Sequence, residues 1–174
     1  EAAAAGASVM LADKGVVGDS GSSPHALVGF SVPLLDEDDS SELFVEDWAN
    51  ASGGICDRDL VAQCAKYGRG LAEDMEERGV PFIKNKDGSW FIAKRAGHSV
   101  RRTIQAEGLG KGVHSNVIAP MRPALIEAGV ELSENTMITR LLLDGNRVAG
   151  AYAIGPDGEP FIIRAKAVVL ASGG

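Results

Sequence analysis

Long apolar runs, cysteines and net positive charge are all scarce in this sequence of 174 residues. No apolar stretch approaches the ~20 residues that span a bilayer, so we expect no transmembrane segment. The two cysteines, Cys56 and Cys64, have no second pair nearby, which predicts free thiols rather than a zinc site, and we expect no bound metal. The formal net charge of −7 argues against a nucleic-acid partner, although local basic groups can still attract a small anion.

The composition of the sequence is typical of a folded domain. Hydrophobic residues make up 45% and charged residues 24%, which is ordinary for a globular chain with room for one core. The 22 glycines exceed the usual share and suit tight turns around a ligand. The sequence opens inside a run of helix formers, Glu1–Ala5, and stops at a glycine pair, so we expect an internal part of a larger protein. The expected location is the cytoplasm.

Two helices are predicted in the N-terminal half. Asp39, with Glu42 three positions later, resembles a capping box and predicts a helix to about residue 51. Asp57 is expected to cap a second helix, which stops at Gly79. Apolar residues at helical spacing predict the buried face of this second helix: Leu60, Cys64, Tyr67, Leu71 and Met75.

The C-terminal half predicts a series of short strands. A hairpin is expected first at residues 85–92, "NKDGSWFI". Residues 113–128 have a helical composition, but Pro120 and Pro123 must kink or split that helix. Alternating patterns separated by Asp-Gly turns then predict five strands, at about 130–132, 136–143, 147–154, 160–164 and 166–171.

The order of these elements predicts an α/β fold with a β-meander inserted before its last strand. Residues 8–13 are expected to form a first strand. Ala167–Leu170 are apolar on both faces, which is typical of a parallel strand buried between helices. Gly173 and Gly174 would then begin a turn at the carboxyl end of that strand, where open α/β sheets bind ligands.

Asp13 is the first candidate binding residue. In a dinucleotide-binding βαβ unit, an acid at the end of the second strand accepts hydrogen bonds from the ribose hydroxyls of adenosine. The plainer alternative is that Asp13 only ends a strand. The glycine fingerprint of such a unit would fall before residue 1, so the sequence neither contains nor refutes it.

Two loops carry further candidates. The stretch "GDSGSSPHALVGF", residues 18–30, combines glycines that allow close backbone approach with serines that can cradle phosphate, although a flexible surface loop has the same composition. The stretch "KRAGHSVRR" is a dense basic cluster, in which His98, Arg101 and Arg102 are candidates to clamp a carboxylate or phosphate. The alternative for this cluster is a solvated loop with surface salt bridges. The "GLGKG" segment at 108–112 lacks the rest of the Walker pattern and is not expected to be a nucleotide loop.

Several of these stretches occur in one order that resembles a known family. They are "EAAAAGASVMLADKG", the Gly/Ser loop, "GICDRDLV", "MEERGVPF", "GHSVRR", "RLLLDGNRVAGAYA" and "AKAVVLASGG". The order resembles the flavoprotein subunits of succinate dehydrogenase and fumarate reductase together with L-aspartate oxidase, and it is nearest in look to L-aspartate oxidase. The resemblance implies that residues 1–174 are part of a Rossmann-like FAD-binding domain of the two-dinucleotide-fold flavoprotein type, with an inserted β-meander and helical segment. It also implies that the N-terminal glycine loop and the C-terminal capping domain of the family are missing here.

The resemblance implies FAD as the cofactor and assigns residues to it. Asp13 takes the place of the acid that holds the adenosine ribose, and Lys14 follows it as in the family. The matched loop along the flavin contains Ser20, Gly21, Ser22 and Ser23, and its closing glycine pair falls on Val28 and Gly29. The strand that meets the adenine carries Met137 and Ile138. The segment that approaches the pyrophosphate carries Ala171, Ser172 and Gly173.

The departures from the family limit what is carried over. The arginine that the family uses as its proton shuttle lies in the missing capping domain, so no catalytic residue is assigned. The family's threonine-glycine after the "HSxxR" segment is Leu109–Gly110 here, which weakens the transfer of substrate residues. Ser22 stands where some members carry the histidine that is linked to the flavin, so we expect FAD to be held noncovalently.

The function implied is that of an FAD-dependent oxidoreductase, which transfers a hydride between the flavin and a small carboxylate or dicarboxylate. A further expected partner is a protein that transfers electrons. Two alternatives stay open: an enzyme similar to ketosteroid dehydrogenase with a different cap, and an inactive FAD-binding fragment.

Overall fold

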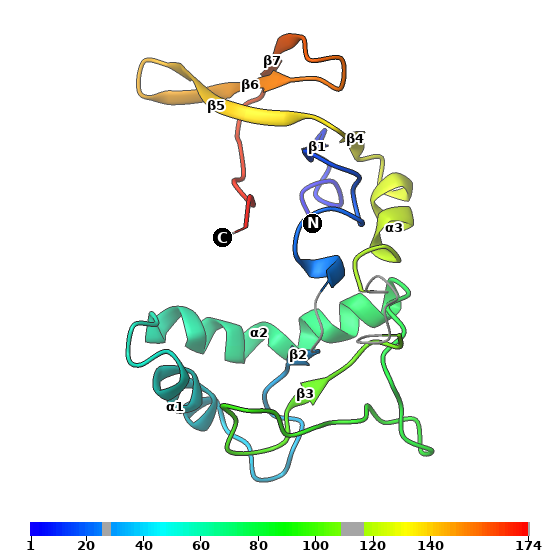
Figure 1. The fold of residues 1–174 in the computed structure, drawn as a ribbon, viewed down its shortest axis with the longest axis vertical. Coiled ribbons are helices and arrows are strands. Elements are labelled where there is room, and N and C mark those ends of the chain that lie inside the picture. The colour runs from blue at the N-terminus through cyan, green and yellow to red at the C-terminus, as the bar shows by residue number, and fades with distance from the viewer. Residues whose placement is uncertain (26–28, 109–116, 174) are drawn as a thin grey trace. The chain divides into compact units, whose positions relative to one another are not determined.

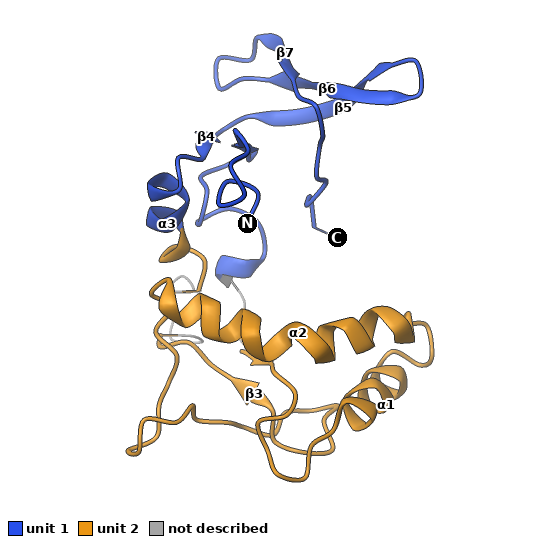
Figure 2. Ribbon diagram, turned by 180° about the vertical axis from the view of Figure 1, so that it is seen from behind, with its two compact units in different colours: residues 1–24, 122–174 blue, residues 25–121 orange. Residues whose placement is uncertain are grey.

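The computed structural model describes residues 1–25, 29–108 and 117–173, and the chain divides into two compact units (Figures 1 and 2). Unit 1 consists of Glu1–Pro24 and Arg122–Gly174, and unit 2 consists of His25–Met121. The two ends of the sequence therefore fold together, and the middle of the sequence forms a unit with its own core.

Unit 1 is built around a parallel pair of short strands. Strand β1 (Met10–Ala12) pairs with β4 (Glu131–Ser133), with Leu11 opposite Leu132. Before β1, the expected helix at Glu1–Ala5 is a single turn that ends at Gly6, whose φ of 85° suits a glycine C-cap. Helix α3 (Met121–Glu127) precedes β4.

Helix α3 is shorter than the helix predicted for residues 113–128. It starts directly after Pro120, and Pro123 falls in its first turn, where the ring removes no intrahelical hydrogen bond. Residues 117–120 form a turn, and residues 113–116 lie outside the described part of the chain. In the described residues the helix therefore begins after Pro120, and it accommodates Pro123 in its first turn.

The predicted β-meander is confirmed. Strands β5 (Met137–Asp144), β6 (Arg147–Ile154) and β7 (Pro160–Arg164) form an antiparallel sheet in that order (Figure 1). The strands turn at Gly145 and Gly158, both with positive φ, as the Asp-Gly pairs predicted.

The last predicted strand, at residues 166–171, is wrong. These residues form no strand, and Val169 and Leu170 are 89% and 68% exposed. Within the described residues no strand pairs with this segment, so its backbone has no ladder to join and its apolar side chains have no surface to cover. The buried central strand expected from its composition is therefore not present here.

Unit 2 contains the two predicted helices. Helix α1 spans Ser41–Ala51 and α2 spans Arg58–Glu77. Asp57 caps α2 as predicted, because its side chain accepts from the amides of Asp59 and Leu60. The predicted capping box of α1 is wrong by one residue: the cap is Ser40, whose Oγ accepts from the amide of Leu43 at 3.1 Å. The preceding residue, Asp39, is used elsewhere in the unit.

The predicted buried face of α2 is mostly wrong. Of the five residues expected inside, only Met75 is buried; the structure exposes Leu60, Cys64, Tyr67 and Leu71. The buried side of the helix instead carries the small residues Ala65 and Ala72, and a Cβ added at Gly68 would lie 3.2 Å from Cδ of Pro33. Close approach of the helix to its neighbours therefore decided which face is inside, rather than the size of the apolar side chains.

The core of unit 2 packs around α2 and a small antiparallel pair, β2 (Phe30–Ser31) and β3 (Thr103–Ile104). Phe82 lies at its centre and makes edge contacts with Phe30 and Trp90, with ring centroids 6.1 and 5.8 Å apart. The expected hairpin at 85–92 is present as a tight turn, with a bridge between Lys84 and Trp90. The buried members of the core cluster are Val32, Ala72, Met75, Val80, Phe82, Ile104, Ala106 and Val117.

Candidate functional site

The carboxyl ends of β1 and β4 bring two carboxylates together in unit 1. Asp13 follows β1 and Glu134 follows β4, and the parallel pairing puts both at the same edge. The backbone ties the two ends together, because the amide of Asp13 donates to Ser133 O at 3.0 Å and the amide of Thr136 donates to Asp13 O at 2.8 Å. This edge is where an α/β sheet places its ligand.

The side chain of Asp13 is held by one of its two oxygens. Oδ1 accepts from the amide of Gly15 at 2.8 Å and from Oγ of Ser20 at 2.6 Å. Among the residues that the structure describes, none donates to Oδ2. The half-buried carboxylate therefore presents one oxygen that is not occupied by any described residue, and such an oxygen is able to accept from a ligand hydroxyl.

Glu134 organises the other side of this edge. Its Oε1 accepts from the amide of Val17 at 2.9 Å and from Nη2 of Arg122 at 3.0 Å. The hydrogen bond from Arg122 and then the one from Val17 hold the pKa of Glu134 below its ordinary value, while the nearby charge of Asp13 acts in the opposite direction. Glu134 is therefore an ionised partner of the loop and of Arg122.

Gly15, Arg122 and Glu134 were not among the residues predicted for the site. The available signal was the matching position of Glu134, which follows the strand predicted at 130–132 just as Asp13 follows the strand predicted at 8–13. Only the parallel pairing of these two distant strands turns that similarity into a shared edge.

The other predicted cofactor residues lie on several separate segments of the sequence. Lys14, Gly21, Ser22 and Ser23 are exposed, and Val28 lies outside the described residues. Five more predicted positions are also exposed. Met137 and Ile138 are on β5, and Ala171, Ser172 and Gly173 follow the meander. No contact of these side chains identifies a cofactor, so their assignment stays a prediction.

Packing explains why residue 29 is a glycine, which the sequence alone did not show. A Cβ at this position would overlap the carbonyl oxygen of Ile104 in β3. The glycine is therefore required for the close passage of two backbone segments inside unit 2. Its assignment to the closing glycine pair of a flavin loop is not tested by this contact.

The basic cluster of unit 2 separates into buried and exposed members. Arg102 is completely buried, with Nη2 2.7 Å from Oδ1 of Asp39 and Nη1 3.1 Å from Oδ2 of Asp47. Its guanidinium also lies 5.2 Å from the ring centroid of Phe44. Arg101 is exposed and pairs with Asp36 at 2.8 Å. The contacts of Arg102 are those of an internal ion pair, and the substrate role predicted for both arginines stays a prediction.

His98 lies beside this buried ion pair. Its Nε2 is 2.8 Å from Oγ of Ser31, and its Nδ1 is buried with no partner among the described residues. Burial and then the positive charge of Arg102 hold the pKa of His98 below its ordinary value. The surroundings of His98 therefore disfavour its protonated form, and its predicted contact with a substrate is untested. The next predicted segment, Leu109–Gly110, lies outside the described residues.

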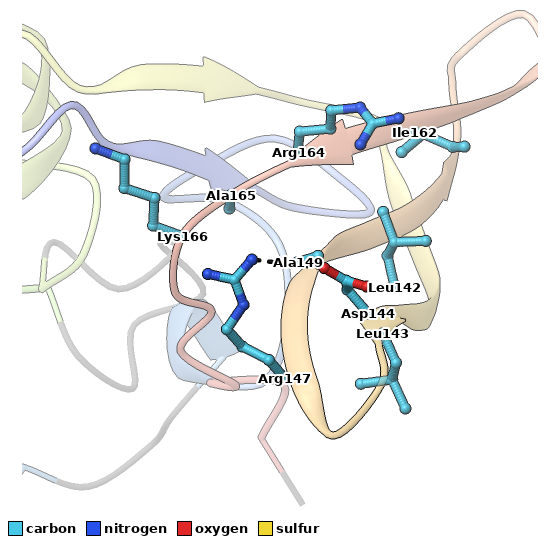
Figure 3. A pocket seen from close by; sticks show the side chains of 9 residues that line it. All are labelled: Leu142, Leu143, Asp144, Arg147, Ala149, Ile162, Arg164, Ala165 and Lys166. Atoms are coloured by element: carbon cyan, nitrogen blue, oxygen red, sulfur yellow. Dashed lines mark ion pairs between the residues drawn. The ribbon is translucent and has the colours of Figure 1, made fainter.

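A hollow of about 520 Å³ lies on the β-meander and contains none of the predicted site residues (Figure 3). Arg147, Arg164 and Lys166 line it together with apolar side chains such as Leu142. Arg147 pairs with Asp144 at 3.6 Å, and both side chains are largely exposed. The three cations do not converge on one point in the close view, so the carboxyl edge of β1 and β4 is the better candidate site.

Comparison with known proteins decides the family. The sequence model of the family described as "FAD binding domain" matches residues 1–174. The chain belongs to this family. The predicted role of Asp13 as the acceptor of a ribose hydroxyl stays a prediction.

The curated relatives of this FAD binding domain are oxidoreductases. It is 32% identical over 167 residues to an L-aspartate oxidase of Agrobacterium fabrum, and 33% identical over 172 residues to an L-aspartate oxidase of Mycobacterium tuberculosis. These matches cover 95% and 98% of this chain but 31% of each relative. One subunit of the fumarate reductase (CoM/CoB) of Methanothermobacter marburgensis is 28% identical over 95% of the chain and 30% of that protein. The chain thus spans about a third of the length of the relatives that it matches.

Solved structures show the same fold. The open conformation of a flavocytochrome c3 fumarate reductase matches with a TM-score of 0.81 and 27% identity, over 99% of this chain and 30% of that one. A quinol-fumarate reductase with menaquinol molecules matches with a TM-score of 0.84 and 24% identity, over the same shares. These matches confirm the predicted fold class, a Rossmann-like FAD-binding fold.

The described residues offer neither a metal cluster nor a membrane-spanning helix. No group of His, Cys, Asp or Glu among them is arranged to hold a metal ion. None of the helices described here has the length and apolar character needed to cross a membrane.

Proposed function

We propose that this FAD binding domain serves an FAD-dependent oxidoreductase of the L-aspartate oxidase and fumarate reductase type. The proposal is supported by relatives of both names, which match nearly the whole chain. When bound, FAD supplies the hydride chemistry, and the protein supplies binding, orientation and electrostatics. The substrate proposed is a small carboxylate, with a dicarboxylate such as aspartate, succinate or fumarate as the first choice.

The observation that carries the proposal is Oδ2 of Asp13, an oxygen at the carboxyl edge of a parallel strand pair that accepts from none of the described residues. A ribose hydroxyl could donate to Oδ2, which accepts from none of the described residues. Gly15 and Ser20 keep the other oxygen occupied, so the carboxylate needs no rearrangement to receive it.

The steroid alternative has only the fold in its favour. A 3-ketosteroid-delta4-(5alpha)-dehydrogenase from Rhodococcus jostii matches with a TM-score of 0.68 at 18% identity. Identity at that level supports a common fold and says nothing of the substrate. The small-carboxylate proposal rests on relatives of higher identity.

Two finer points belong to the same proposal. FAD is held noncovalently, because Ser22 stands where a histidine would be needed for the linkage and a serine hydroxyl does not form it. Electrons pass to or from a partner such as an electron-transfer subunit, which the names of the fumarate reductase relatives suggest. A cytoplasmic location is also part of the proposal.

The test uses the complete protein that contains this chain. We expect the purified protein to show a flavin absorption spectrum that either bleaches when L-aspartate or succinate reduces the flavin, or, after reduction by an added donor, recovers when fumarate reoxidises it. Asp13→Ala should weaken FAD affinity by roughly 1–3 kcal/mol, the scale for a lost hydrogen bond to a charged group. Bleaching by a 3-ketosteroid but by none of the carboxylates would overturn the substrate proposal. Unchanged FAD affinity in Asp13→Ala would show that Asp13 does not hold the cofactor, and the proposal would lose its structural support.

A further inference from the structure

The loop from Asp13 to Ser20 is organised around one carboxylate. We propose that Ser20 is a positioning residue that fixes Asp13 for the adenosine ribose of FAD, and that Glu134 holds the loop that carries Ser20. The inference rests on the proposed role of Asp13 as the ribose acceptor. It changes the predicted place of Ser20 from the flavin end of the cofactor to the adenosine end.

The hydrogen bonds of Asp13 carry the first step. A free aspartate rotates about its side-chain bonds, so either oxygen can face a ligand. Here Oδ1 receives a backbone donor from Gly15 and a hydroxyl donor from Ser20, and the 2.6 Å distance to Ser20 Oγ is in the range of a charge-assisted hydrogen bond. Two donors on one oxygen determine the orientation of the carboxylate, and Oδ2 then points away from both.

The contact between Ser20 and Gly15 carries the second step. A Cβ built on Gly15 would lie 2.7 Å from Cβ of Ser20, so any side chain there would push Ser20 off Asp13. The amide of Ser20 also donates to Val16 O at 3.0 Å, which closes the loop behind the hydroxyl. Ser20 is therefore packed against the backbone at the point from which its hydroxyl reaches Asp13.

The residues after β4 carry the third step. Glu134 accepts from the amide of Val17 at 2.9 Å, and the amide of Asn135 donates to Gly15 O at 2.9 Å. These two contacts hold both sides of the loop between Asp13 and Ser20. Arg122 forms an ion pair with Glu134 at 3.0 Å, and this pair favours the ionised form of Glu134 despite the nearby charge of Asp13. The loop is thus ordered by protein contacts before a ligand arrives, which is how preorganisation lowers the cost of binding.

The experiment measures the affinity of the complete apoprotein for two probes. One probe is FAD, and the other is an FAD analogue that lacks the 2′ and 3′ hydroxyls of the adenosine ribose. We expect Ser20→Ala to weaken binding of FAD about tenfold, because Asp13 loses one of the two donors that orient it. Binding of the analogue should change less than twofold, because it has no hydroxyl to donate to Asp13. A general loss of structure would weaken both probes together.

Ser89→Ala is the matched control. Oγ of Ser89 donates to Oδ1 of Asp87 at 2.6 Å, so this variant removes a serine–aspartate hydrogen bond of the same length from a turn in unit 2. We expect it to leave the affinity for both probes unchanged. Circular dichroism of each apoprotein checks that the variants fold.

Two sets of results would separate the inference from the function on which it rests. Asp13→Asn keeps an acceptor for Gly15 and Ser20 and places an amide in the carboxylate plane, so it should weaken FAD more than the analogue. If Asp13→Asn affects the two probes equally, the ribose role of Asp13 fails. If Asp13→Asn distinguishes the probes but Ser20→Ala weakens both or neither, Asp13 keeps its role and the positioning by Ser20 is refuted.

Discussion

The buried ion pairs of Arg102 make a sharp prediction about unit 2. Replacing Arg102 with Met keeps an unbranched side chain of similar length but removes the only cation beside Asp39 and Asp47 among the described residues. The side chains of Arg102 and Asp39 are completely buried and that of Asp47 is 10% exposed, so both carboxylates would lose their charged partner at a place largely shielded from water. Breaking a buried pair in this way destabilises a protein by about 3–5 kcal/mol.

The remaining contacts of the two carboxylates limit this loss. Asp39 still accepts from the amides of Leu34 and Ser40, both at 2.9 Å. Asp47 still accepts from the amide and hydroxyl of Ser99, at 2.8 and 3.0 Å. Because these donors stabilise the charges, we expect the free energy of unfolding to fall by about 3 kcal/mol, the lower end of that range. A loss of that size is a large share of the ~5–15 kcal/mol that stabilises a typical domain.

The assay is urea unfolding of the chain, followed by tryptophan fluorescence. Trp48 and Trp90 are the only tryptophans in the sequence, and both belong to unit 2, so they report on the unit that contains the ion pair. The control is Arg69→Met, which removes an arginine from its pair with Glu73 in the same unit, where both side chains are more than half exposed. A pair between exposed side chains contributes little to stability, so this control should unfold close to the wild type.

A double variant makes the reasoning refutable even if Arg102→Met folds poorly. Adding Asp47→Asn to Arg102→Met removes one of the two unpaired charges, while the amide oxygen of the asparagine can still accept from the amide and hydroxyl of Ser99, so part of the lost stability should return. If the double variant is no more stable than Arg102→Met, unpaired charge is not the cause of the loss. If Arg102→Met unfolds like the wild type and instead raises the KM for a carboxylate substrate, Arg102 serves the substrate and the buried-pair argument is wrong.

Three further outcomes are expected. The pKa of His98 in the folded state lies below its ordinary value, so the unfolded chain binds the proton more readily. The contribution of His98 to stability should therefore be complete above about pH 6.5 and should decrease as the pH falls below that value. In urea titrations at several pH values, His98→Gln should lose this pH dependence. Acid precipitation of the complete protein should release the flavin into the supernatant, because Ser22 offers no histidine for a linkage; a yellow pellet with a flavin-bearing peptide would contradict this. Gly29→Ala should lower the melting temperature because its Cβ would overlap the carbonyl of Ile104, and a normal melting temperature would mean that the two backbones can separate.

Local signals in the sequence were enough to predict several elements. Strands β5, β6 and β7 were predicted to within a residue or two, because alternating side chains and Asp-Gly turns act between neighbours in the chain. The start of α2 was predicted for the same reason, since the side chain of Asp57 caps amides two and three residues away. Asp13 was singled out by its place at the end of a strand, and the structure adds a free oxygen at that place.

Tertiary contacts decided what no local pattern records. The exposed Leu60, Tyr67 and Leu71 have the spacing of a buried stripe, but the helix turns its small residues inward because the ring of Pro33 and the core come close there. Burial depends on which surface a segment meets, and that surface comes from residues far away in the sequence.

The candidate site shows the same division most clearly. The sequence identified Asp13 as an acid after a strand, and the resemblance to a flavoprotein family suggested what it would bind. Only the parallel pairing of β1 with β4 brought Glu134 to the same edge, where it holds the loop through Val17, more than a hundred positions earlier in the chain. A hydrogen bond of that range depends on the path of the whole chain between its partners, and so the arrangement that orients Asp13 was decided by the tertiary structure.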